Sequence, residues 1–127
     1  MLGFFKGKSK DNIIYSPCKG KVVPITEVSD PTFSEKVLGD GFAVIPSEGK
    51  IYAPADGEIS MVLDTLHAVT MTTSQGTELL IHIGLDTVTL KGEPFISHVS
   101  GGQQVKKGDL LLEADLEKIK SAGLDTI

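Results

Sequence analysis

The stretch Ser16-Pro17-Cys18-Lys19-Gly20-Lys21-Val22 recurs later in the chain as Ala53-Pro54-Ala55-Asp56-Gly57-Glu58-Ile59. Both segments read small residue, Pro, two variable residues, Gly, one variable residue, and then Val or Ile. This order is typical of a tight turn that leads into a strand. A third turn signal, residues 105–109, precedes the apolar run Leu110-Leu111-Leu112. The duplicated unit predicts an all-β fold, an antiparallel sandwich or barrel built from two related halves.

The length of 127 residues predicts a single domain with one real core. We expect a flexible N-terminal tail over residues 1–12 and the folded domain over residues 13–127. Helix is scarce in the pattern. One or two turns are expected at residues 32–38, where Phe33 and Val37 fall on one face, and another short helix is expected at residues 116–122.

The charge pattern excludes several functions. The net charge is −5, and all twelve basic residues are lysines, so neither a basic nucleic-acid face nor an arginine phosphate clamp is present. The single Cys18 cannot form an internal disulfide and is read as a half-buried thiol, which fits a reducing cytoplasm. Residues 1–10 lack the order of a secretory signal and are read as a plain tail or, at most, a weak amphipathic membrane contact.

Strand parity gives one histidine an unexpected position. In Glu78-Leu79-Leu80-Ile81-His82-Ile83-Gly84-Leu85-Asp86-Thr87-Val88, the most apolar run of the chain, side chains of an extended strand would alternate between two faces. The odd-numbered apolar residues from 79 to 85 then form the core face. His82 falls on the opposite face, together with Gly84 and Asp86.

A second histidine lies on the preceding run, and only residues 74–76 separate the two runs, so an antiparallel hairpin is expected. A two- or four-residue loop would place His67 directly opposite His82, with Cβ atoms roughly 4.5–5.5 Å apart. A three-residue loop with Gly76 in the left-handed conformation would instead place Ala68 opposite His82. The sequence leaves both registers open.

Two facing imidazoles permit several chemistries. They could be structural, bind a metal, act as general acid and base, or accept a phosphoryl group on one ring while the other ring stabilises its charge. The chain offers no third close ligand at a convincing spacing, so no resident metal and no cofactor is expected, although a transient zinc ion at His67 and His82 stays an alternative. The residues alone do not decide among these chemistries.

Four blocks of sequence resemble a known family. They are Phe33-Ser34-Glu35-Lys36-Val37-Leu38-Gly39-Asp40-Gly41, Ala53-Pro54-Ala55-Asp56-Gly57, Thr65-Leu66-His67-Ala68, and residues 80–92, which contain His-x-Gly-x-Asp-Thr-Val. In this order they look like the glucose-type IIA component (EIIA type 1) of the bacterial phosphoenolpyruvate:sugar phosphotransferase system. The likeness extends from about Ser16 to Asp115.

The resemblance implies a cytoplasmic phosphocarrier of sugar uptake with the duplicated hybrid fold of that family. His82 would accept a phosphoryl group from phosphohistidine on the carrier HPr and pass it to a cysteine of a sugar-specific IIB domain next to its IIC permease. His67 would stabilise the phosphoryl group, and Thr65 would orient His67. Regulatory target proteins are further partners that the resemblance allows.

The resemblance also implies a partner-binding surface. Asp30 and Asp86 would meet arginines of the carrier. An apolar ring around the histidines would exclude water from the transfer; its members are Phe33, Val37, Leu38, Leu63, Leu80 and Val88. For Leu63 and Val88 an ordinary core position is an equal alternative.

The chain departs from the family in two ways. Leu80 and Ile83 stand where some relatives carry Phe, and the family domain continues with further strands beyond a segment like residues 122–127. His98 matches no site and is read as a solvent-facing strand residue. Three rival functions remain. One is a regulatory binding module of the same fold. Another is a zinc-dependent peptidase-like domain, although its His-x-His and His-x-x-x-Asp spacings are absent, and the third is a lipoyl or biotinyl carrier, although its modified lysine has no match.

Overall fold

The structure is a computed structural model that describes residues 13–127. The predicted tail at residues 1–12 lies outside these residues. Within them, nine strands form three antiparallel sheets, and only short helices accompany them. The strands are β1 (Gly20–Pro24), β2 (Phe42–Pro46), β3 (Lys50–Tyr52), β4 (Gly57–Val62), β5 (Ala68–Thr73), β6 (Glu78–His82), β7 (Phe95–Ser97), β8 (Gln104–Val105) and β9 (Leu110–Ala114).

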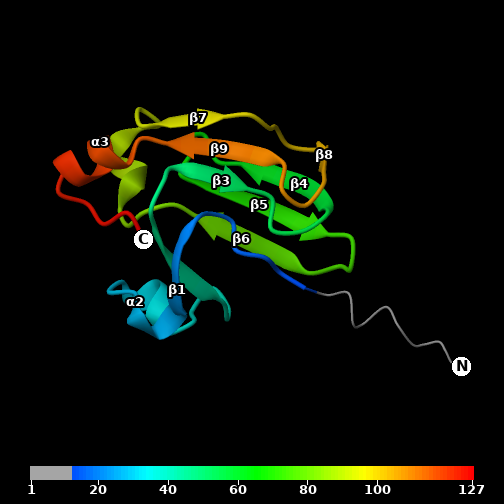
Figure 1. Cartoon of the computed structure of the whole chain (residues 1–127), viewed down its shortest axis with the longest axis horizontal. Coiled ribbons are helices and arrows are strands. Elements are labelled where there is room, and N and C mark those ends of the chain that lie inside the picture. The colour runs from blue at the N-terminus through cyan, green and yellow to red at the C-terminus, as the bar shows by residue number, and fades with distance from the viewer. Residues whose placement is uncertain (1–12) are drawn as a thin grey trace, which may run out of the picture.

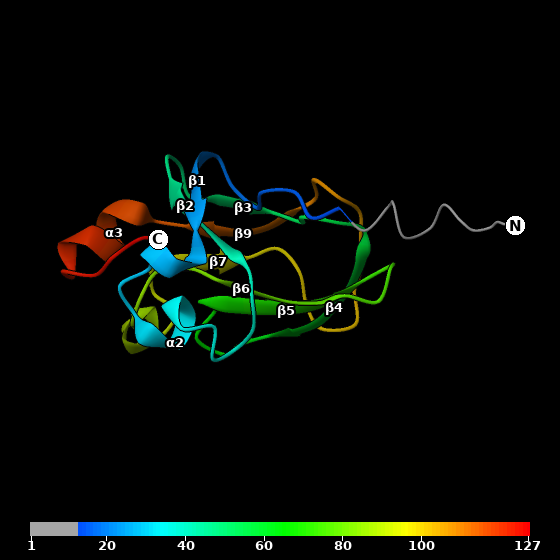
Figure 2. The same cartoon turned by 90° about the horizontal axis from the view of Figure 1, so that it is seen from below.

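Two of the sheets face each other as layers. The four-stranded sheet has the order β6-β5-β4-β8, and the three-stranded sheet has the order β3-β9-β7. Figure 2 shows β3, β9 and β7 on one side and β6, β5 and β4 on the other, with the paired strands β1 and β2 at the end that also carries the C-terminus. This arrangement confirms the predicted antiparallel sandwich.

The core fills the space between the layers. Ile59 and Val69 of the four-stranded sheet and Leu111 and Leu112 of β9 are all fully buried, as is Ile119 of the C-terminal helix. Burying one such side chain contributes about 1.5–3 kcal/mol relative to leaving it exposed. The apolar faces predicted from strand alternation therefore hold the two layers together.

The repeated sequence unit has the same structural role in both copies. Gly20 begins β1 and Gly57 begins β4. A Cβ atom at Gly20 would collide with the carbonyl oxygen of Ile45, and one at Gly57 would collide with that of Thr72. Each glycine thus lets its strand approach the backbone of the paired strand, which explains why the repeat keeps glycine at this position.

The helices begin where the sequence provides caps. The side chain of Asp30 accepts a hydrogen bond from Thr32 N–H at the start of α2 (Pro31–Ser34), and Asp115 caps α3 (Leu116–Ser121) in the same way. The first helix is shorter than the predicted 32–38, since Lys36 takes a positive φ of 58°. Two 3₁₀ turns, η2 (Ile25–Glu27) and η3 (Thr87–Leu90), complete the list. None of the helices within residues 13–127 has the length and apolar character needed to cross a membrane.

Candidate phosphohistidine site

The strand that carries His82 follows the predicted alternation within β6, whereas residues 83–85 beyond its end are all buried. Ile81, Ile83 and Leu85 are buried, whereas Leu80, on the face of His82, is 43% exposed and His82 itself is half-buried. The β5–β6 pairing places Ala68 opposite His82 and Thr72 opposite Glu78. The register that places His67 opposite His82 is therefore wrong. The loop has three residues, and Gly76 has φ 91°, which is the alternative that the sequence had left open.

The two histidines nevertheless meet. His67 lies just before β5, after Leu66, whose backbone is left-handed at φ 59°. The carbonyl of His67 accepts a hydrogen bond from Ile83 N–H at 2.8 Å. The ring centroids of His67 and His82 lie 5.0 Å apart, with an interplanar angle of 84°. A turn at Leu66, rather than direct strand pairing, brings the imidazoles together.

Thr65 contacts the ring of His67, as the family resemblance implies. Its Oγ1 lies 2.6 Å from His67 Nδ1, and His67 is only 8% exposed. A hydroxyl that donates to Nδ1 leaves the proton of a neutral ring on Nε2. The contact therefore holds the orientation of this ring, and with the hydroxyl as donor the Nε2–H of His67 points outward to a ligand.

Burial sets the charge state of the pair. Desolvation lowers the pKa of His67 below its ordinary value of 6.5. Desolvation also lowers the pKa of His82, and His67 adds to that effect, while a hydrogen bond to the backbone of Gly84 and the carboxylates of Asp30 and Asp86 oppose it. Both rings are thus neutral at pH 7, and a neutral ring has the lone pair that a nucleophile or a metal ligand needs.

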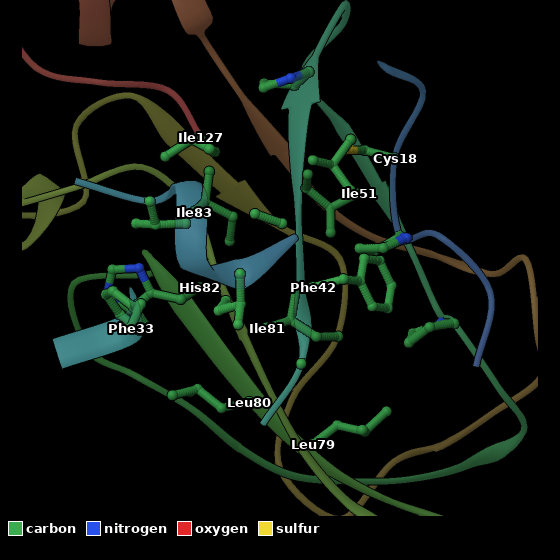
Figure 3. Close-up of a pocket in the computed structure, with 18 of the residues that line it drawn as sticks. Cys18, Phe33, Phe42, Ile51, Leu79, Leu80, Ile81, His82, Ile83 and Ile127 are labelled. Carbon is green, nitrogen blue, oxygen red and sulfur yellow. The ribbon is translucent and has the colours of Figure 1, made fainter. Parts of the chain in front are cut away.

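Phe33 packs directly on the second histidine. The ring centroids of Phe33 and His82 lie 4.8 Å apart with an interplanar angle of 53°, and Figure 3 shows the two side chains next to each other, with Leu80 further along β6. Four other members of the predicted apolar ring are solvent-exposed rather than core: Val37, Leu38, Leu80 and Val88 are 43–69% exposed. Leu63 is half-buried.

Both predicted carboxylates lie near the pair, but the strand argument for Asp86 is wrong. The strand ends at His82, and Gly84 and Asp86 have positive φ values of 75° and 60°. Asp86 is exposed at the start of η3, close enough to act on the charge of His82. Asp30 acts from the other side while it caps α2.

Beside His82 lies an apolar cavity of about 400 Å³ that the sequence did not predict. Figure 3 shows residues that line it from the β1–β2 region, from β6 and from the C-terminal end, among them Phe42, Ile81 and Ile127. Cys18 also lines it, and burial, with a smaller effect of Glu48, raises the pKa of this thiol. The thiol is therefore protonated and unreactive at pH 7, as expected of a half-buried cysteine.

The third histidine lies away from this pair, and the pair alone is too small a set of ligands for a metal ion. His98 is exposed just past the end of β7, and its Nε2 lies 2.7 Å from Glu113 Oε2. The described residues contain no group of three or more His, Cys, Asp or Glu that could hold a metal ion. The pair His67 and His82 could supply two ligands to zinc, and a partner would have to supply the others.

Comparisons with known proteins show what the whole chain is similar to. The profile of a family described as phosphoenolpyruvate-dependent sugar phosphotransferase system, EIIA 1, matches residues 12–127. The PTS system glucosamine-specific EIICBA component of Bacillus subtilis (strain 168) is 52% identical over 122 residues, which cover 96% of this chain and 19% of that protein. The chain therefore spans about a fifth of the length of this curated relative.

A solved structure matches the fold. Glucose permease IIA from Mycoplasma capricolum superposes with a TM-score of 0.87 at 37% sequence identity, over 98% of this chain and 80% of that one.

Proposed function

The chain belongs to the EIIA 1 family of the phosphoenolpyruvate-dependent sugar phosphotransferase system, and from this premise we propose that it is a phosphocarrier domain of sugar uptake whose acceptor is His82. The observation that carries the proposal is the contact of two neutral imidazoles at the edge of an exposed apolar surface. Of the two rings, His82 is the more exposed, and His67 is the one fixed by a side-chain hydrogen bond.

The first step joins the phosphoryl group to His82. The lone pair of one ring nitrogen attacks the phosphorus of a phosphohistidine donor, the new N–P bond forms, and the donor's N–P bond breaks to release its imidazole. The other ring nitrogen of His82 would keep its proton and point it toward the backbone of Gly84, which raises the pKa of His82 against the effect of burial.

The second histidine acts on the charge of the phosphoryl group. With Thr65 on Nδ1, the Nε2–H of His67 can donate to a phosphoryl oxygen held between the two rings. Such a donor stabilises the charge that builds up on the oxygens during transfer. In the second step a cysteine thiolate of the acceptor attacks the phosphorus, and the bond to His82 breaks.

The surroundings suit docking of a protein partner. Phe33, Val37, Leu38, Leu63, Leu80 and Val88 would form the apolar contact surface, which excludes water from the transfer. Asp30 and Asp86 would meet cationic side chains of the phosphoryl donor, which favours rapid association. This division suits a chain without arginine, since the partner brings the cations.

The partners follow from the family. The donor would be the carrier HPr, and the acceptor a IIB domain with its IIC permease, as the name of the EIICBA relative suggests. All of these steps would take place in the cytoplasm, and regulatory target proteins could share the same surface.

A direct test uses the phosphoryl chain itself. The protein is incubated with phosphoenolpyruvate, enzyme I and HPr, and its intact mass is measured. We expect an increase of one phosphoryl group that is labile in acid and stable in base, as for phosphohistidine, and that is absent in His82→Gln. An unmodified mass would instead favour a regulatory binding module of the same fold.

A further inference from the structure

The turn that leads to His67 contains a strained residue. It joins β4 to β5, which lie side by side with β6 in Figure 1. Leu66, directly before His67, has φ 59°. In this left-handed conformation the Cβ atom of an L-residue comes too close to the following carbonyl oxygen, so glycine or asparagine usually occupies such positions. A leucine stays there only where its surroundings hold it.

The side chain of Leu66 sets this residue apart. Three other non-glycine residues within residues 13–127 have positive φ values, and all three are exposed: Lys36, Asp86 and Lys91. Leu66 instead is half-buried and packs against the apolar core. It also faces the turn after η3, since a Cβ atom at Gly92 would lie 3.8 Å from both Leu66 Cγ and Leu66 Cδ1. The side chain therefore contacts the core and lies close to the Gly92 turn.

Backbone hydrogen bonds connect this turn to His67. Leu66 N–H donates to the carbonyl of Leu63 at 2.8 Å, and Leu63 N–H donates to that of Ala68 at 3.1 Å. The carbonyl of His67 accepts from Ile83 N–H at 2.8 Å. His67 thus lies between a closed turn on its N-terminal side and a bond to Ile83 on its C-terminal side.

The direction of the His67 side chain depends on the backbone of Leu66. Thr65 and His67 flank Leu66 in the sequence, and Thr65 Oγ1 lies 2.6 Å from His67 Nδ1. A rotation about φ or ψ of Leu66 would turn His67 relative to Thr65, and a hydrogen bond survives only a small change of distance and angle. The contact between Thr65 and His67 therefore requires the left-handed conformation of Leu66.

We propose that Leu66 is a positioning residue for His67: its half-buried side chain holds the left-handed turn, and this turn holds the His67 ring against Thr65 and His82. The inference rests on the proposed function for its catalytic meaning, because the held ring is the one that would donate to the phosphoryl oxygens. Leu66 acts only through His67.

The test measures the tautomer ratio of His67 in the unphosphorylated protein by ¹⁵N NMR of the ring nitrogens, and then the rates of both phosphoryl-transfer steps. Leu66→Ala removes the anchoring side chain and keeps the strained backbone. Leu66→Asn also removes the apolar anchor but takes the left-handed conformation readily, whereas Leu66→Met keeps an apolar side chain of similar volume. Leu79→Ala is the matched control, because Leu79 of β6 is likewise half-buried and packs against the core.

The His67 ring should lose its preferred tautomer only where the anchor is lost. Leu66→Ala and Leu66→Asn should reduce the tautomer ratio by up to about fivefold, the effect of one neutral hydrogen bond. Transfer from His82 to the acceptor should slow by a similar factor, whereas acceptance of the phosphoryl group should stay near the original rate. A mere loss of folded protein would lower both rates together. Leu66→Met and Leu79→Ala should keep the original ratio.

Three results would overturn the inference. The first is an original tautomer ratio in folded Leu66→Ala or Leu66→Asn, which would show that the side chain is not needed to orient the ring. The second is an equal reduction in Leu79→Ala, which would show a general loosening of the domain. The third, which decides even if Leu66→Ala does not fold, is an equal ratio in Leu66→Asn and Leu66→Met. Failure of the unchanged protein to accept a phosphoryl group would refute the proposed function alone, because the tautomer measurement needs no phosphoryl donor.

Discussion

Thr65→Val tests the role of the hydroxyl that contacts His67. The substitution removes one oxygen and nearly preserves the side-chain shape, so the change is confined to the 2.6 Å contact with His67 Nδ1. A neutral hydrogen bond contributes about 0.5–1.5 kcal/mol. If the bond orients the ring fully in the transition state, transfer should slow roughly 2- to 12-fold. Thr65→Ser keeps the hydroxyl and should stay close to the unchanged rate.

The assay separates the two steps. Rapid-quench measurements follow acceptance from phosphorylated HPr and then single-turnover transfer to a IIB domain, with thermal melts to check the fold of each variant. ¹⁵N NMR should in addition show that His67 loses its preferred tautomer in Thr65→Val. Equal transfer rates for Thr65→Val and Thr65→Ser, in folded proteins, would refute the orienting role.

Three further predictions address the same site. His82→Gln should abolish phosphorylation because an amide is no nucleophile, whereas His67→Gln should still accept a phosphoryl group but pass it on slowly; a phosphorylated His82→Gln protein would reverse the assignment. Phosphoryl acceptance should persist below pH 6.5, because burial lowers the pKa of both histidine rings and a ring loses its nucleophilic lone pair only when it is protonated. An acceptance rate that is already halved above pH 6.5 would contradict this. Asp86→Asn, which tolerates the φ of 60°, should slow association with the carrier by up to about tenfold at low salt and little at high salt. Glu117→Gln removes an equally negative, exposed side chain on α3 and serves as the control. Equal salt dependence of the two variants would argue against a docking role.

The local parts of this fold could be predicted because alternation is a local property. Within β6, Ile81 is buried and Leu80 is exposed as their alternating positions predict, and each repeated turn begins its strand at the glycine that both copies share. The register of β5 and β6 depends on a single loop residue. Gly76 is as compatible with a two-residue loop as with a three-residue loop, so the sequence could not choose between the pairings.

The geometry of the histidine pair depends on residues whose backbone conformation their residue type does not predict. Leu66 and Asp86 both have left-handed backbones, and a leucine in this conformation costs roughly 1–2 kcal/mol. Only the surrounding tertiary contacts can offset such a cost. The hydrogen bond from Gly84 N–H to the carbonyl of Ile127 is equally invisible in the sequence, because backbone groups make it and any residue carries these groups.

His67 and His82 lie where the hydrogen-bonded pairing of β5 and β6 ends. This position explains how the site can be both rigid and accessible. β5 begins one residue after His67, and β6 ends at His82. Within a sheet, neighbouring strands take up the backbone hydrogen-bonding groups of each residue, and each side chain is confined to one of two faces. Past the end of the pairing, these groups make other contacts. The carbonyl of His67 accepts from Ile83 N–H, Gly84 N–H donates to the carbonyl of Ile127, and Leu85 N–H donates to that of Asp125. The rings are therefore held by the buried sheet below them and lie at its edge, as the proposed transfer of a phosphoryl group between two proteins would require.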